Sequence, residues 1–184
     1  MDRRRALMAQ QGAGPVYVDF TPVEYLESPL TSINHCGCIL GQTNSQLLYV
    51  EATVTQLASG DNIFFATRGS SDTIPTYPYF GSTNRGYNTD QSPVIGSKTT
   101  IRATRTGTQS PNAKVRVGGW QDATYTRRTQ FYDFKIFNSS NVLIAHYIPG
   151  YKTSTNRTGF YDTESDTFYP EITESGWGFL RSST

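Results

Sequence analysis

Residues 129–149 read TQFYDFKIFNSSNVLIAHYIP, and this stretch decides the fold. Within it, aromatic or aliphatic residues occupy every second position of 132–136, which is typical of a strand with one buried face. The run 142–148 carries apolar residues at both parities, and this indicates a strand covered on both sides. Between the two runs lie Asn-Ser-Ser-Asn at 138–141, short polar residues that favour a tight reversal. The stretch therefore predicts a β-hairpin in the core of a sheet.

The rest of the chain repeats the strand pattern. Alternation is clearest at 47–57 and recurs at 98–106, and further strands are expected at 62–68, 113–117 and on both sides of a turn at 162–166. The segment 31–40 is rich in small residues and is expected to turn, a long irregular loop is expected at 69–78, and the segment 82–93 is polar. Aromatic residues make up 13% of the 184 residues, which favours strands over helices. We therefore expect ten to twelve short strands in an all-β, two-sheet antiparallel sandwich.

Several motifs outside the hairpin carry a family resemblance. They are VEYLES at 23–28, GFYD at 159–162, TFY at 167–169 and GWG at 176–178. Together with the hairpin, they resemble a concanavalin A-like (laminin-G-like) jelly-roll family that is found in tailed-bacteriophage virion proteins and gut-bacterial surface proteins. The resemblance spans 23–179 in outline and is specific at its two ends. It implies a jelly-roll fold and a role in a virion or on a cell surface.

The first residues differ from the rest of the chain. We expect a basic N-terminal arm and linker at 1–22, followed by one jelly-roll domain at 23–184. A secretion signal is not expected, because the apolar run after the arginines is too short. The arm is either a disordered tail or a peptide that folds on docking to a larger assembly. The resemblance favours a virion anchor formed by Arg3, Arg4, Arg5, Leu7 and Met8.

Cys36 and Cys38 are the only cysteines and flank a single glycine. A disulfide across this spacing would be strained, so reduced thiols are expected. With His35 they form one crowded cluster, whereas a zinc site usually pairs two such clusters. We therefore predict no metal, and the thiols suggest assembly in a reducing cytoplasm.

Candidate catalytic residues are few. Asp162, Glu164 and Asp166 stand at alternate positions, and glycoside hydrolysis needs two carboxylates. Their order differs from the Glu-x-Asp-x-x-Glu of related jelly-roll glucanases, and their place between strand ends favours a turn. His146 alternates with isoleucines and is expected in the core with one hydrogen-bond partner. No phosphate-binding loop is present, and no cofactor is expected.

A binding site remains the alternative to catalysis. Sugars present flat apolar faces ringed by hydroxyls, so a sugar site combines aromatic rings with planar polar groups. The candidates with this chemistry are Tyr77, Tyr79, Arg85, Tyr87, Asn88, Trp120 and Gln121. The same residue types are common in protein interfaces and in ordinary packing, so these interpretations stay open.

The expected function is that of a non-enzymatic structural or attachment protein of a tailed-phage virion, as a capsid decoration, head fibre or tail-associated protein. The alternative is a free-standing lectin or a glucanase-like glycoside hydrolase. The expected partners are other capsid or tail proteins, host-surface carbohydrate and further copies of the chain. With a net charge of +1 and no long apolar run, neither nucleic-acid binding nor membrane insertion is expected.

Overall fold

The computed structural model describes residues 19–28, 36–59, 62–63, 65–68, 79–80, 87–106, 111–118, 128–173 and 178–183. Over these residues the chain is all-β and forms fifteen strands. The strands are β1 (Thr21–Pro22), β2 (Leu26–Ser28), β3 (Cys36–Thr43), β4 (Tyr49–Gln56), β5 (Asn62–Ile63), β6 (Phe65–Arg68), β7 (Tyr79–Phe80), β8 (Tyr87–Thr89), β9 (Lys98–Arg105), β10 (Lys114–Val117), β11 (Thr129–Phe137), β12 (Leu143–Tyr151), β13 (Thr158–Asp162), β14 (Thr167–Thr173) and β15 (Leu180–Arg181). The predicted all-β class is confirmed.

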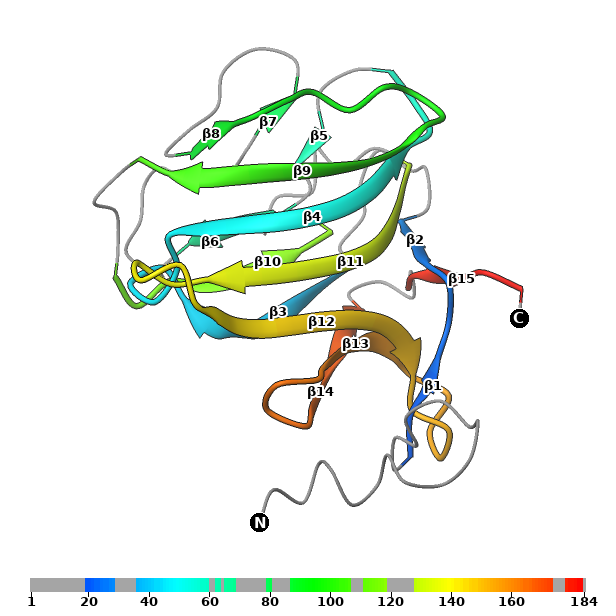
Figure 1. Cartoon of the computed structure of the whole chain (residues 1–184). Coiled ribbons are helices and arrows are strands. Elements are labelled where there is room, and N and C mark those ends of the chain that lie inside the picture. Colours follow the sequence, from blue (N-terminus) through cyan, green and yellow to red (C-terminus); the bar gives the residue numbers. More distant parts are fainter. Residues whose placement is uncertain are drawn as a thin grey trace, which may run out of the picture.

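The strands form one curled antiparallel sheet that folds over on itself as a jelly-roll-like sandwich. Its order is β6-β10-β3-β14-β13-β12-β11-β4-β9-β8, while β5 and β7 pair separately. In Figure 1, β9, β4, β11 and β12 form one layer, and β6, β10 and β3 lie behind them. Strand β14 joins the layers, because 167–170 pair with β13 and 171–173 pair with β3. A strand that changes partners in this way turns the corner of a sandwich.

The core lies between these layers. Alternate residues of β4 and β11 point inward and meet side chains from β3, β6 and β10 in one cluster. Its fully buried aromatic members include Phe131, Phe134 and Phe160, which contact one another along their edges or at a tilt. Such pairs add to the free energy of area burial. The opposite faces of β4, β9 and β11 point away from this core.

The predicted hairpin is confirmed. Strands β11 and β12 pair antiparallel, and the Asn138 side-chain oxygen accepts the N–H groups of Ser140 and Val142 at 3.0 Å each. Asn141 takes a left-handed φ of 59°, which asparagine tolerates better than most residues. The turn at 138–141 therefore forms for the reason that its composition indicates.

The alternation predicted for β11 is interrupted. The register with β4 shifts between Phe131 and Asp133, which is a β-bulge. The bulge reverses the inward parity, so Phe131 is fully buried while Tyr132 is half-buried on the outer face. The expectation that Tyr132 shares the buried face of Phe134 was therefore wrong.

The expectation of a turn over 31–40 was wrong for the described part of that segment. Strand β3 begins at Cys36 and lies between β10 and β14. Its small residues make close packing possible, because a side chain at Gly41 would overlap the Tyr169 ring. Small residues here mark a crowded strand, which has the same local composition as a turn.

Three other expectations also need correction. The single strand expected at 62–68 is divided, because β5 pairs with β7 and β6 pairs with β10. The polar segment 82–93, in which no strand was expected, contains β8 as an edge strand. Strand β12 was expected to be covered on both sides, yet Ala145 and Tyr147 are buried while Ile144 and Ile148 are only half-buried.

The two ends of the described chain lie together. Strand β15 pairs with β2, and β1 pairs with the end of β12 (Figure 1). Phe20 is buried and stacks on Tyr161 with ring centroids 4.8 Å apart. Packing against the sheet therefore already includes residue 20, whereas the predicted anchoring residues Arg3, Arg4, Arg5, Leu7 and Met8 lie outside the described residues. The described part of the chain contains no helix that could span a membrane.

Candidate functional site

The seven predicted sugar-binding residues do not form one described site. Tyr77, Arg85, Trp120 and Gln121 lie outside the described residues. Tyr79 is in β7, where only the backbone is described. The remaining two candidates, Tyr87 and Asn88, are neighbours on β8 with different surroundings.

Tyr87 does not belong to a surface site. Its exposed fraction is 1%, and its ring meets Phe65 edge-on with centroids 5.1 Å apart. Burial raises the pKa of its hydroxyl to about 12, because a phenolate would lose its hydration. The expectation that Tyr87 offers a ring to a ligand was therefore wrong. Asn88 is exposed and lies opposite Thr104 of β9.

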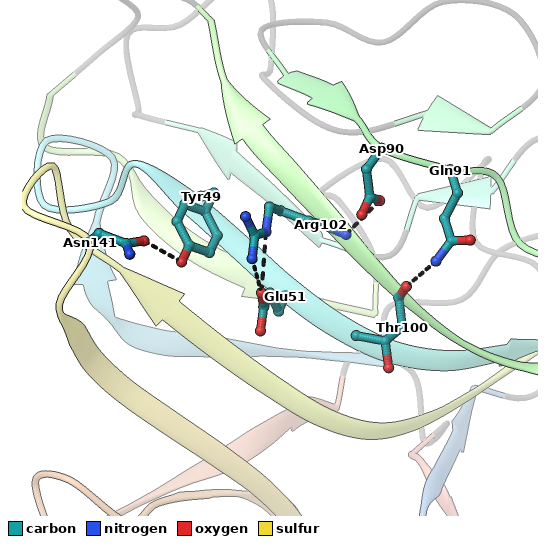
Figure 2. A network of polar contacts seen from close by, with 7 residues as sticks. All are labelled: Tyr49, Glu51, Asp90, Gln91, Thr100, Arg102 and Asn141. Atoms are coloured by element: carbon teal, nitrogen blue, oxygen red, sulfur yellow. Dashed lines mark hydrogen bonds and ion pairs between the residues drawn. The ribbon is translucent and has the colours of Figure 1, made fainter.

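Next to Asn88 is a sheet face that sequence reasoning did not select. We call it the β4–β9 face and define it by the outward side chains Tyr49, Glu51, Thr53, Thr100 and Arg102. Figure 2 shows most of these side chains on adjacent strands, with Arg102 above the ribbon between Tyr49 and Glu51. The register places Glu51 opposite Arg102 and Thr53 opposite Thr100. The face is therefore built by direct cross-strand pairs.

The guanidinium of Arg102 is held in a fixed position. Its Nε and Nη2 donate to one oxygen of Glu51, at 3.2 and 2.7 Å. Its Cζ atom lies 4.4 Å from the centroid of the Tyr49 ring, which stacks on Phe137 of β11 at 4.5 Å. These hydrogen bonds raise the pKa of Arg102 above its ordinary value. The guanidinium therefore remains charged and planar while its side chain is 49% exposed.

The Arg102–Glu51 pair keeps hydrogen-bonding capacity on its solvent side. Among the described residues, the second oxygen of Glu51 and the Nη1 of Arg102 have no hydrogen-bond partner. The pair therefore offers both an acceptor atom and a donor atom to a ligand. Adjacent hydroxyl groups of a sugar ring need this combination, because each hydroxyl both donates and accepts.

Two side chains cap the backbone edge of β9 beside this pair. A carboxylate oxygen of Asp90 accepts the backbone N–H of Arg102 at 2.9 Å, and Gln91 donates to the carbonyl of Thr100 (Figure 2). These contacts continue the pairing of β8 past its last residue. An edge strand capped in this way is less open to pairing with another chain.

A second aromatic pair lies at the other end of β9. The ammonium of Lys98 is 3.8 Å from the centroid of the Tyr132 ring, and Tyr25 packs against that ring at a tilt, with centroids 5.4 Å apart. Between the two aromatic pairs, the hydroxyls of Thr53 and Thr100 are hydrogen-bonded at 2.9 Å. Lys98 and Arg102 thus each place a cation over an aromatic pair, separated by hydroxyl groups.

The predicted core histidine lies on the outer side of the sheet. His146 is half-buried, and its Nε2 is 3.1 Å from an Asp133 carboxylate oxygen without the geometry of a hydrogen bond. The other Asp133 oxygen is 3.4 Å from the ammonium of Lys135. The expectation of a core position for His146 was wrong, because β12 exposes part of that face.

The acidic triplet forms a turn, as its composition predicted. The Asp162 carboxylate is fully buried and accepts the N–H groups of His146 and Glu164 at 3.1 and 3.0 Å and the Ser165 hydroxyl at 2.6 Å. Asp166 has a φ of 56°, which places it at the sharp part of the turn. The Asp162 oxygens are therefore occupied by the chain itself.

Cys38 is a buried free thiol, as expected for reduced cysteines. It donates toward the carbonyls of Tyr169 and Pro170, at 2.8 and 3.2 Å. Burial raises the pKa of this thiol far above its ordinary value, so it stays neutral and unreactive. The described residues contain no cluster of three side chains suited to a metal ion.

The sequence did contain a signal for the β4–β9 face. Residues 49, 51 and 53 share one parity of a strand, and residues 98, 100 and 102 share the outward parity of another. Only pairing of the two strands places Glu51 beside Arg102. Comparison with protein-family models, with curated proteins and with solved structures found no match to this chain.

Proposed function

We propose that the chain is a non-enzymatic structural and attachment module of a tailed-phage virion. In this proposal the N-terminal arm holds the module on the particle, and the β4–β9 face contacts carbohydrate on the host surface. The virion setting rests on the motifs at 23–28, 129–149 and 159–178, which resemble jelly-roll proteins of phage particles. The carbohydrate contact rests on the geometry of the face.

One observation supports the carbohydrate contact most directly. Arg102 is fixed by Glu51 and Tyr49 on an exposed sheet surface, and the pair keeps an unused donor atom and an unused acceptor atom. Neither side chain needs to be ordered on binding, which lowers the entropic cost of association. Asn88 and the second Asp90 oxygen extend the polar surface across β8. A chain of sugars lying across the strands would meet fixed polar groups on neighbouring strands.

The carboxylates of this sheet side favour binding over hydrolysis. A glycosidase needs one carboxyl that holds a proton and a second that attacks or activates water. Glu51 contacts Arg102, whereas Asp133 contacts Lys135 and lies close to His146. Both carboxylates are thus engaged by cationic neighbours, an arrangement suited to holding a surface together.

A matched set of variants tests the carbohydrate contact. Immobilised host-surface polysaccharide is titrated with the full chain, with Arg102→Ala and with Lys114→Gln, which removes the same charge from β10 in the other layer. Loss of a charged hydrogen bond should weaken binding about tenfold or more in Arg102→Ala. Lys114→Gln should bind as the unaltered chain does. Equal binding by all three proteins would reject the β4–β9 face as the contact surface.

Deletion of residues 1–14 tests the virion role. We expect the shortened chain to keep its far-ultraviolet circular dichroism and melting temperature and to disappear from purified particles. Unchanged incorporation would remove the anchoring role of the arm. A chain that is never found in particles but binds polysaccharide would instead be a free-standing lectin. Release of reducing sugar ends by purified protein would identify the glucanase-like alternative.

A further inference from the structure

A second polar site lies where the two ends of the described chain meet. An open cavity of about 360 Å³ is lined by Val23, Tyr151, Arg181, Ser182 and Ser183. These residues come from the link between β1 and β2, the end of β12, and β15 with the residues after it, which lie together at one side of the sandwich (Figure 1). The cavity does not share a residue with the β4–β9 face.

Arg181 supplies the charge of this cavity. Its Cζ atom lies 4.2 Å from the centroid of the Tyr151 ring, and its Nη1 donates to the Asn156 side-chain oxygen at 2.8 Å. Among the described residues, its remaining N–H groups have no partner, and no carboxylate lines the cavity. The guanidinium is thus oriented by a ring and an amide without being neutralised.

Ser182 adds a buried donor. It is 7% exposed, and its oxygen accepts the backbone N–H groups of Glu24 and Tyr25 at 3.0 and 3.4 Å. With its acceptor side occupied in this way, the hydroxyl proton has no acceptor among the described residues. A buried donor without an acceptor is unfavourable in an empty site and favourable once a ligand oxygen arrives.

We propose that this cavity binds the carboxylate of an acidic sugar of the hexuronate class. A carboxylate accepts up to four hydrogen bonds, and the residues that line the site carry the donors for them, namely the remaining guanidinium N–H groups of Arg181 and the hydroxyls of Ser182, Ser183 and Tyr151. Val23 and the Tyr151 ring provide apolar wall for the ring carbons of the sugar. The volume lies in the range of small-molecule sites.

The test uses two sugars that differ at one group. Glucuronate and glucose share a ring and most hydroxyls, but only glucuronate carries a carboxylate. Each is titrated into the isotope-labelled full chain while amide chemical shifts are followed by NMR. We expect glucuronate to shift the amides of Tyr151, Arg181 and Ser182, and we expect glucose to bind at least about tenfold more weakly.

Three variants separate recognition from general charge attraction. Arg181→Gln should weaken glucuronate binding about tenfold or more. The affinity of Arg181→Lys should lie between those of Arg181→Gln and the unaltered chain, because an ammonium keeps the charge but cannot donate two parallel hydrogen bonds to one carboxylate. Lys114→Gln in the other layer removes the same charge and should have no effect. Arg181 is exposed, so its variants should fold normally.

Several results would overturn the proposal. They are equal affinity for glucose and glucuronate, full binding by Arg181→Gln, shifts that avoid the cavity residues, or no binding of glucuronate at all. The result of this test can be distinguished from the result for the β4–β9 face, because the polysaccharide binding of that face is measured with the Arg102→Ala variant. Glucuronate binding without polysaccharide binding would support the cavity and reject the face.

Discussion

Replacing Phe179 with alanine should destabilise the sandwich by about 3–5 kcal/mol, the usual range for a buried phenylalanine. Its exposed fraction is 6%, and its ring meets those of Phe131 and Phe160 edge-on, with centroids 5.9 and 6.0 Å apart. Loss of ring burial accounts for roughly 2–3 kcal/mol of the expected cost. The cavity left between the rings of Phe131 and Phe160, together with the lost edge contacts, supplies the remainder.

Urea unfolding followed by tryptophan fluorescence measures this effect. With a denaturant slope of about 2 kcal/mol per molar urea, the midpoint should fall by roughly 1.5–2.5 M. The neighbouring Leu180 is 55% exposed, so Leu180→Ala should change the free energy of unfolding by less than about 0.5 kcal/mol. A Phe179→Ala midpoint within 0.5 M of the unaltered protein would refute the view that the C-terminal segment closes the core.

Three further predictions follow from single residues. The pKa of Tyr87 is near 10 in the unfolded chain and about 12 in the folded chain. The contribution of this neutral hydroxyl to the free energy of unfolding is therefore complete below pH 10, and between pH 10 and 12 it falls by roughly 1.4 kcal/mol per pH unit. Tyr87→Phe should remove this part of the alkaline slope in denaturant titrations, and an unchanged slope would contradict the assignment. Gly159→Ala should cost about 1–3 kcal/mol, because its Cβ would overlap the Tyr169 carbonyl and approach the Pro170 Cα to 2.9 Å; Gly96→Ala, with no atom within 4 Å and a φ of 77°, should cost about 1 kcal/mol by thermal melting. Asp162→Ala should cost about 2–3 kcal/mol in urea by stranding its hydrogen-bond donors, whereas Asp166→Gly should be neutral or stabilising at its φ of 56°, and equal effects would argue against the turn.

The fold class could be predicted because its signals are local. Alternation at 47–57 and 98–106 corresponds to β4 and β9, and the hairpin turn at 138–141 forms as its composition indicates. The Asp162 turn could be predicted for the same reason, since the carboxylate accepts from residues within three positions on its C-terminal side. Where one or two residues nearby in the sequence decide the backbone conformation, the sequence is sufficient to predict that conformation.

The pairing of strands that are far apart in sequence decided where the candidate sites lie. Tyr87 lies in a polar stretch of sequence that is typical of a surface loop, but β8 turns its ring toward Phe65 in the opposite layer. The Arg102–Glu51 pair spans 51 positions of sequence, and its contact exists only because β4 and β9 pair in one register. A shift of β9 by one residue relative to β4 would turn Arg102 to the core side and leave Glu51 on the outer side.

The sequence by itself determined that this chain forms strands, where its tightest turns lie and that its core is aromatic. These properties depend on side-chain parity and on short-range hydrogen bonds, which any stretch of chain carries with it. Only the tertiary structure decided that Tyr132 lies outside the core, that β14 joins the two layers and that Arg181 covers Tyr151. The physical reason is that a bulge, a corner and a contact between chain ends are set by the register of strands far apart in sequence.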